Sequence, residues 1–413
     1  MEMVKKIPIS IPAISIARSI FGRDFFESLF SLFLCTIGDL ITGIVIGTFT
    51  GYLKMLPALL ILIPPTIDMR GNIFASLGSR LGTYLHTGEI EPSFRINPIL
   101  SQNISSSLAL TGFTSIFLGF LSAIVANIMG MPATFQDLIL ISIIAGVLSA
   151  IVMLLLTFLV AFLSFKRGWD PDNTSAPIVT LIGDMVTLPF MFLSMLPVMS
   201  MRGFAKDILV AVSVILILIL PLIYSDKNKR IYSRIIKESL PILLLCGMLG
   251  VLSGSTLTSR IEDFIAIPGL LILIPPFLED GGALGGILAS KLSSMLHLGS
   301  LDCEKPFSRD VGKLFALSHL LSIFVFSMVA IFGYISAHFL NIQTLPFTDI
   351  LIVSILAGEI LTLIVNLVTY YTAILSFKRG IDPDNVTIPI ITSVIDLVGS
   401  VCLVGVLVML GMI

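Results

Sequence analysis

Long apolar stretches separated by short polar segments dominate the pattern of this chain. Eleven of these stretches are long enough to cross the roughly 30 Å of bilayer hydrocarbon as helices. Membrane strands are excluded, because the stretches lack the alternation of apolar and polar positions that barrel strands show. The stretches lie near residues 28–53, 57–85, 105–128, 135–165, 174–199, 207–224, 240–257, 268–296, 311–341, 346–377 and 386–410. The pattern therefore predicts an all-α integral membrane protein with about eleven transmembrane helices.

The composition supports this class and excludes several others. Only 12% of the 413 residues are charged, compared with about 25% in soluble domains, and the mean hydropathy is +1.06. The 24 basic and 26 acidic residues leave no positive excess for binding nucleic acid. The four cysteines show no metal-binding spacing. No nucleophile–base arrangement or HExxH helix indicates an enzyme.

An internal repeat organises the chain. The segment Leu59–Pro65 recurs as Leu270–Pro276, 211 residues later, and Leu163–Gly168 recurs as Leu375–Gly380, 212 residues later. Each half holds five apolar stretches, and the sixth lies between the halves. With this linking helix, both halves enter the membrane from the same side. We therefore predict two parallel five-helix repeats around a pseudo-two-fold axis along the membrane normal. This parity depends on the stretch at 240–257, which is the weakest.

The repeat and the charges predict domain boundaries and an orientation. The basic turns at Lys166-Arg167 and Lys378-Arg379 fall on the side of the basic N-terminal segment. Because positive loops face the cytoplasm, we expect a plasma-membrane protein with its N-terminus cytoplasmic and its C-terminus outside. The predicted units are an interfacial amphipathic segment at 1–27 (or a simple leader into the first helix), a first repeat at 28–200, a linking helix with a basic loop at 201–238, and a second repeat at 239–413.

The fifth helix of each repeat carries a carboxylate deep inside an apolar stretch. Asn173 and Asn385 are predicted N-caps of these helices. Asp184 and Asp396 follow eleven residues later, about 16 Å along a helix, which places them near the bilayer midplane. A carboxylate at that depth is costly and indicates a function.

One turn earlier, Thr180 and Thr392 lie on the same helix faces as the two aspartates. Two-fold symmetry would bring both Asp–Thr faces together across the axis. The alternative is that each aspartate is paired for structural reasons, although no basic residue lies within a turn of either.

The second helix of each repeat combines a double proline with oxygen-bearing side chains. Pro64-Pro65 and Pro275-Pro276 leave carbonyl groups without helical donors, which must be buried in protein or line water. Carboxylate and amide oxygens without thiolate or imidazole suit Mg²⁺, with Mn²⁺ or Ca²⁺ possible. The residues that follow the double proline are Asp68, Arg70, Gly71 and Asn72 in the first half and Glu279, Asp280, Gly281, Gly282 and Ala283 in the second.

These motifs resemble the membrane domain of the MgtE-type magnesium transporters. They comprise Pro-Asp-Asn followed by Pro and Asp, the double-proline helix ending in Gly-Asn, and Ser79–Leu81 with its repeat Ser290–Leu292. Two copies joined by a linking helix are most similar to the solute-carrier magnesium transporters of that superfamily. The resemblance implies a path on the pseudo-two-fold axis, lined by the second and fifth helices of each repeat. It also implies that the aspartates matching Asp184 and Asp396 hold the metal ion.

The sequence thus predicts transport of divalent cations, most plainly Mg²⁺, by a single chain acting as an internal pseudo-dimer. The alternatives are a Na⁺- or H⁺-coupled divalent-cation exchanger and a non-transporting membrane scaffold. Arg70 could neutralise Asp68 or act as a gate, and Glu359 could bind a coupling proton or sodium ion. The candidate metal ligands are Asp184, Asp396, Thr180, Thr392, Asn72, Asp68, Glu279 and Asp280.

Overall fold

A computed structural model describes residues 23–167, 171–224, 230–297, 299, 301, 308–379 and 383–413, and every regular element in these residues is a helix. Eleven of the thirteen helices have 22 or more residues, and each of them overlaps one of the eleven predicted apolar stretches, although the first stretch, predicted to residue 53, is divided between α2 and α3. The helices are α2 (Arg23–Thr48), α3 (Thr50–Met55), α4 (Leu59–His86), α5 (Pro98–Ile128), α6 (Phe135–Lys166), α7 (Pro171–Ser200), α8 (Gly203–Tyr224), α9 (Arg230–Thr258), α10 (Ile261–Ala266), α11 (Gly269–His297), α12 (Arg309–Phe339), α13 (Phe347–Lys378) and α14 (Pro383–Met409). The predicted all-α class is confirmed.

Within the described residues, nine helices are long and apolar enough to cross a membrane. This finding confirms an integral membrane protein. Helices α4 and α8 are outside this set, and α4 is the helix that carries Asp68, Arg70, Asn72 and two internal prolines. The number of helices that cross the bilayer therefore stays a prediction.

The helix packing of one half is repeated in the other. Helix α4 packs against α5, α6 and α7, and α11 packs against α12, α13 and α14 in the same way. The first helix of each half crosses to the opposite half, because α2 packs against α11 and α12, while α9 packs against α4 and α5. The two halves are therefore interlocked. The direction of their symmetry axis relative to the membrane remains a prediction.

Two glycine contacts hold the crossed helices against their partners. Gly43 of α2 lies against the main-chain carbonyl of Ile272 in α11, and Gly254 of α9 lies against that of Ile61 in α4. A proline four residues later in each helix leaves these carbonyls without their helical donors. The freed carbonyls are thus buried between helices, where a glycine permits the closest backbone approach.

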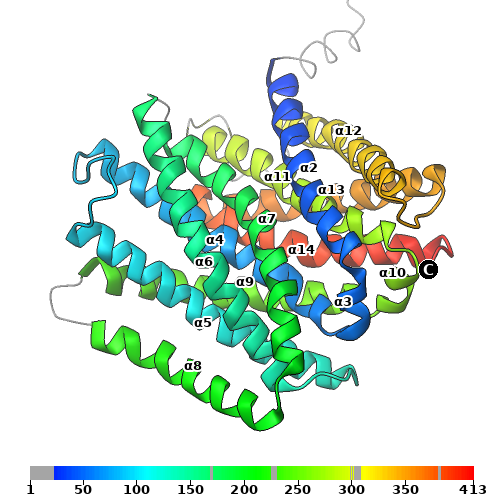
Figure 1. Ribbon diagram of the computed structural model, residues 1–413. Coiled ribbons are helices and arrows are strands. Elements are labelled where there is room, and N and C mark those ends of the chain that lie inside the picture. Colours follow the sequence, from blue (N-terminus) through cyan, green and yellow to red (C-terminus); the bar gives the residue numbers. More distant parts are fainter. Residues whose placement is uncertain are drawn as a thin grey trace, which may run out of the picture.

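The linking helix α8 lies at the edge of the bundle, beside α5 and α6 (Figure 1). Lys206 near its start forms an ion pair with Asp137 of α6 at 2.6 Å. Gln136 donates a hydrogen bond to Asp207 at 2.8 Å. These contacts fix the start of α8 to the first half.

The predicted N-caps are wrong. Helices α7 and α14 begin at Pro171 and Pro383, so Asn173 and Asn385 lie inside the first turn. Proline is favoured at that first position because its missing N–H has no helical acceptor there. Most of the predicted interfacial segment, residues 1–22, and much of the basic loop, residues 225–229, lie outside the described residues.

Candidate cation site

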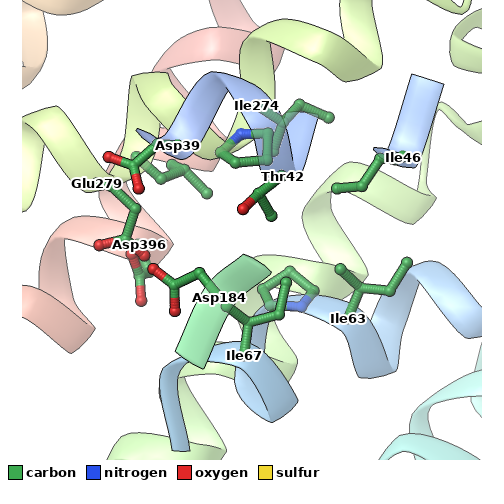
Figure 2. A pocket seen from close by; sticks show the side chains of 12 residues that line it. Asp39, Thr42, Ile46, Ile63, Ile67, Asp184, Ile274, Glu279 and Asp396 are labelled. Atoms are coloured by element: carbon green, nitrogen blue, oxygen red, sulfur yellow. The ribbon is translucent and has the colours of Figure 1, made fainter. Parts of the chain in front are cut away.

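A narrow pocket lies where the two halves meet (Figure 2). Helices α2, α4 and α7 contribute to it from the first half, and α11 and α14 contribute from the second. Its volume is about 40 Å³, which is room for roughly three water molecules. The lining residues are Asp39, Thr42, Ile46, Ile63, Pro64, Ile67, Asp184, Ile274, Pro275, Leu278, Glu279 and Asp396.

Four carboxylates gather on one side of this pocket. Asp39, Asp184, Glu279 and Asp396 point toward one another, while Ile46 lies on the opposite side (Figure 2). Asp39 and Asp184 are each 3% exposed and Asp396 is 8% exposed. None of the four takes part in the ion pairs that the described residues form. The pocket, which we call the acidic pocket, therefore has four carboxyl groups at one end and no basic partner for them among the described residues.

Two further carboxylates lie behind the lining. Asp68 accepts a hydrogen bond from Asn72, one turn along α4, at 2.8 Å, and its second oxygen is buried without a partner among the described residues. Asp68 is within electrostatic range of Asp184 and Asp396. Asp280 is fully buried and accepts a hydrogen bond from Thr36 of α2 at 2.7 Å. These two acids lie next to the pocket without lining it.

The predicted threonines face neighbouring helices. Thr180 of α7 lies against Gly71 of α4, and the repeat-related Thr392 of α14 faces Gly282 of α11. Neither threonine is among the residues that line the acidic pocket. Their position fixes the spacing between the second and fifth helices of each half, and these are the helices that carry the acids.

Arg70 is directed away from the acids. Its side chain is fully buried, and its Nη2 donates a hydrogen bond to Ser115 of α5 at 2.7 Å. The same guanidinium lies beside Gly146 of α6. Among the described residues it forms no ion pair with Asp68. In the second half, Gly281 is the counterpart of Arg70, and Phe326 lies against Gly358, the counterpart of Gly146.

Glu359 has a partner that the sequence did not indicate. Its Oε2 lies 2.7 Å from Nδ1 of His319, which comes from the neighbouring helix α12. Both side chains are about one third exposed, at 29% and 33%. Neither residue lines the acidic pocket.

The acidic pocket lacks the geometry of a closed metal centre. No group of three or more His, Cys, Asp or Glu side chains in the described ranges lies close enough to hold a metal ion directly. Mg²⁺ requires six ligands and dehydrates reluctantly, so it is usually bound through one or two carboxylates with several waters retained. The four convergent carboxylates suit such a hydrated ion once the pocket has widened beyond its present three-water size.

Asp39 is an acid that lines the pocket but was not among the candidate metal ligands predicted from the sequence. Its counterpart in the second half, 211 residues later, is Gly250, which lies against Pro65 of α4. A search for acids that recur in both halves therefore passes over Asp39. Its position within the apolar helix α2 is itself the signal, because a carboxylate in such a helix indicates a function.

An interlocked helical membrane protein with unpaired acids between its halves belongs, by fold and site, to the class of cation-handling membrane proteins. The sequence model of the MgtE family, described as divalent cation transporter, matches residues 63–194 and 274–406. The chain belongs to this family. The two matched segments correspond to the two halves of the chain.

Curated relatives support the same assignment. The chain is 25% identical over 404 residues to solute carrier family 41 member 3 of Mus musculus, covering 91% of this chain and 80% of the relative. It is 26% identical over 366 residues to solute carrier family 41 member 2 of Homo sapiens, covering 83% of this chain and 62% of the relative. No solved structure matches the chain significantly.

Proposed function

We propose that this protein transports divalent cations, principally Mg²⁺, across the membrane through a path between its two halves. The observation that carries the proposal is the acidic pocket, where Asp39, Asp184, Glu279 and Asp396 converge from α2, α7, α11 and α14. The second helices α4 and α11 complete the wall of the path through Pro64 and Pro275. Unpaired carboxylates inside a bundle are stabilised when a cation binds between them.

The lining chemistry favours hard cations. Among the described residues that line the acidic pocket, the polar side chains are the four acids and Thr42, and none is a cysteine or histidine. Hard oxygen ligands suit Mg²⁺, Ca²⁺ and Mn²⁺ better than Zn²⁺ or Cu⁺. Mg²⁺ dehydrates more reluctantly than Ca²⁺ and is usually held through one or two carboxylates with several waters retained, which suits a hydrated ion among these four acids.

The candidate ligands divide into three groups by their distance from the path. Asp184, Asp396, Glu279 and Asp39 would contact the ion or its water shell. Asp68, with Asn72, and Asp280 would raise the negative potential behind the lining and attract the ion. Thr180 and Thr392 would act by positioning the acid-bearing helices.

The proposed setting is the plasma membrane, with the N-terminus cytoplasmic and the C-terminus outside. The basic turns after the fourth helix of each half support this orientation. Because both halves of the pocket come from one chain, a single copy would be sufficient for transport. The proposed protein is a transporter and not an enzyme.

Purified protein in liposomes loaded with a Mg²⁺ indicator tests the proposal. Uptake of Mg²⁺ above that of empty liposomes is expected, with Mn²⁺ competing more strongly than Ca²⁺. Absence of uptake of all three ions, together with no thermal stabilisation by any of them, would contradict transport and favour the scaffold alternative.

A further inference from the structure

A row of polar side chains runs between α12 and α13, outside the lining of the acidic pocket. His319 of α12 bonds to Glu359 of α13 at 2.7 Å, and Thr362 of α13 donates to the hydroxyl of Ser322 of α12 at 2.8 Å. We call this row the α12–α13 seam. It consists of His319, Ser322, Glu359, Thr362, Asn366 and Thr369.

The seam continues along one face of α13. Glu359, Thr362, Asn366 and Thr369 are spaced by three, four and three residues, which places them on one side of a helix. The ten residues from first to last span about 15 Å of helix. The polar face thus extends over roughly half of the bilayer hydrocarbon.

Several polar atoms of the seam are buried without a partner. Asn366 is 1% exposed and Thr369 is fully buried. Both polar atoms of Asn366, the hydroxyl of Thr369 and Oε1 of Glu359 have no hydrogen-bond partner within the described part of the chain. Unpaired polar atoms in a low-dielectric interior are costly, so Asn366 and Glu359 favour a small polar or charged occupant.

The first half shows that the fold does not require this polarity. The residues equivalent to His319, Glu359, Thr362 and Asn366 are apolar there: Leu108, Val147, Ala150 and Leu154. The hydroxyls of Ser322 and Thr369 recur in the first half as those of Thr111 and Thr157, so the polarity specific to the second half is that of the other four residues. A feature present in one half of a repeated fold is better explained by binding than by folding.

We propose that the α12–α13 seam is a second cation site, which binds one monovalent cation, a proton or Na⁺, separately from the acidic pocket. A single carboxylate shared with an imidazole suits one positive charge, whereas the four acids of the pocket suit a divalent ion. For Na⁺, the hydroxyls of Ser322, Thr362 and Thr369 and the amide oxygen of Asn366 supply hard ligands. For a proton, His319 and Glu359 are the acceptors.

The helices around the seam bring other titratable groups. Among the side chains that the structure describes, the acidic and basic ones on these helices are Asp39 from α2, Glu279, Asp280 and Lys291 from α11, and Asp396 from α14. The four acids lie in or beside the acidic pocket. His319 and Glu359 are hydrogen-bonded to each other, and within the described part of the chain neither bonds to a residue that lines the pocket.

Binding is tested on the purified full chain by its melting temperature. One titration replaces choline with Na⁺ at constant ionic strength and pH, and the other varies pH without Na⁺. The variant carries first-half residues, His319→Leu, Glu359→Val and Asn366→Leu, because the same fold accommodates these residues at the equivalent positions. The wild type is expected to respond to Na⁺ or to pH by several degrees, and the variant is expected to lose that response.

A matched pair of variants controls for folding. Thr369→Val is expected to weaken the response, while Thr157→Val at the equivalent position of the first half leaves it unchanged. A wild type that responds to neither titration, or a triple variant and a Thr369→Val variant that both respond as the wild type does, would overturn the proposal.

Coupling to transport rests on the proposed function and needs a separate readout. Mg²⁺ flux in liposomes is measured with imposed Na⁺ or pH gradients. The wild-type flux is expected to follow one of the gradients, and the triple variant is expected to follow only the Mg²⁺ gradient. If no divalent flux occurs at all, the transport proposal fails, while the melting-temperature response still decides whether the seam binds a cation. Flux in the wild type that ignores both gradients would show that a cation in the seam is not coupled to transport.

Discussion

Gly254 of α9 lies directly against the main-chain carbonyl of Ile61 in α4, a carbonyl that Pro65 has deprived of its helical donor. The repeat of this contact joins Gly43 and Ile272. The prolines and the crossed helices therefore act together. Each proline frees a main-chain carbonyl group, and a glycine of the crossed helix lets the two backbones pack closely over it.

The glycine contact predicts a size limit. Gly43→Val and Gly254→Val are each expected to lower the free energy of unfolding by about 1–3 kcal/mol, because no side chain fits against the carbonyl. Thermal unfolding in detergent measures the effect. Gly286→Ala in α11 serves as the control, since an added methyl group there meets nothing within 4 Å. Equal stability of all three variants would refute the proposed role of the contact.

Asp39 is predicted to be as important as the repeat-related acids. Asp39→Asn replaces one of the four carboxyl groups of the acidic pocket with little change in shape, and it is expected to reduce Mg²⁺ uptake by about tenfold or more. The exposed Glu262, which lies outside the pocket lining, provides the control as Glu262→Gln. Uptake by Asp39→Asn equal to that of the control would remove Asp39 from the site.

Arg70 is predicted to be neither a gate nor a counter-ion for the pocket acids. Because its guanidinium bonds to Ser115 between α4, α5 and α6, Arg70→Met is expected to leave the rate and ion selectivity of uptake unchanged per folded molecule. Its stability should be equal or higher, since an apolar side chain often replaces a buried charge without loss. A changed preference among Mg²⁺, Mn²⁺ and Ca²⁺ in this variant would contradict the structure.

The linking helix is predicted to depend on one buried ion pair. The side chains of Lys206 and Asp137 are only 13% and 7% exposed. Lys206→Met leaves the Asp137 charge without its partner and is expected to destabilise the protein by about 3 kcal/mol. The double variant Lys206→Met, Asp137→Asn should lose less than the sum of the two single variants. The exposed pair of Arg234 and Glu238 offers the comparison, because removing it should change little.

The helices could be predicted from the sequence because their apolar runs match the membrane thickness, and a run of that length has one stable form. Asp184 and Asp396 could be predicted to meet because both occur at the same position of a repeat. The contact of each first helix with the opposite half could not, since apolar runs do not encode which helices become neighbours. The partner of Glu359 was hidden for the same reason: His319 is 40 residues away and belongs to another helix.

Mg²⁺ uptake by Asp184→Ala and Asp396→Ala in liposomes tests the central claim most directly. Each variant is first shown to unfold at the wild-type temperature, so that a loss of uptake reports on the site and not on the fold. The proposed path predicts that either substitution reduces uptake to the level of empty liposomes, because both carboxylates face the same ion in the acidic pocket. Wild-type uptake by both single variants and by the double variant would contradict it.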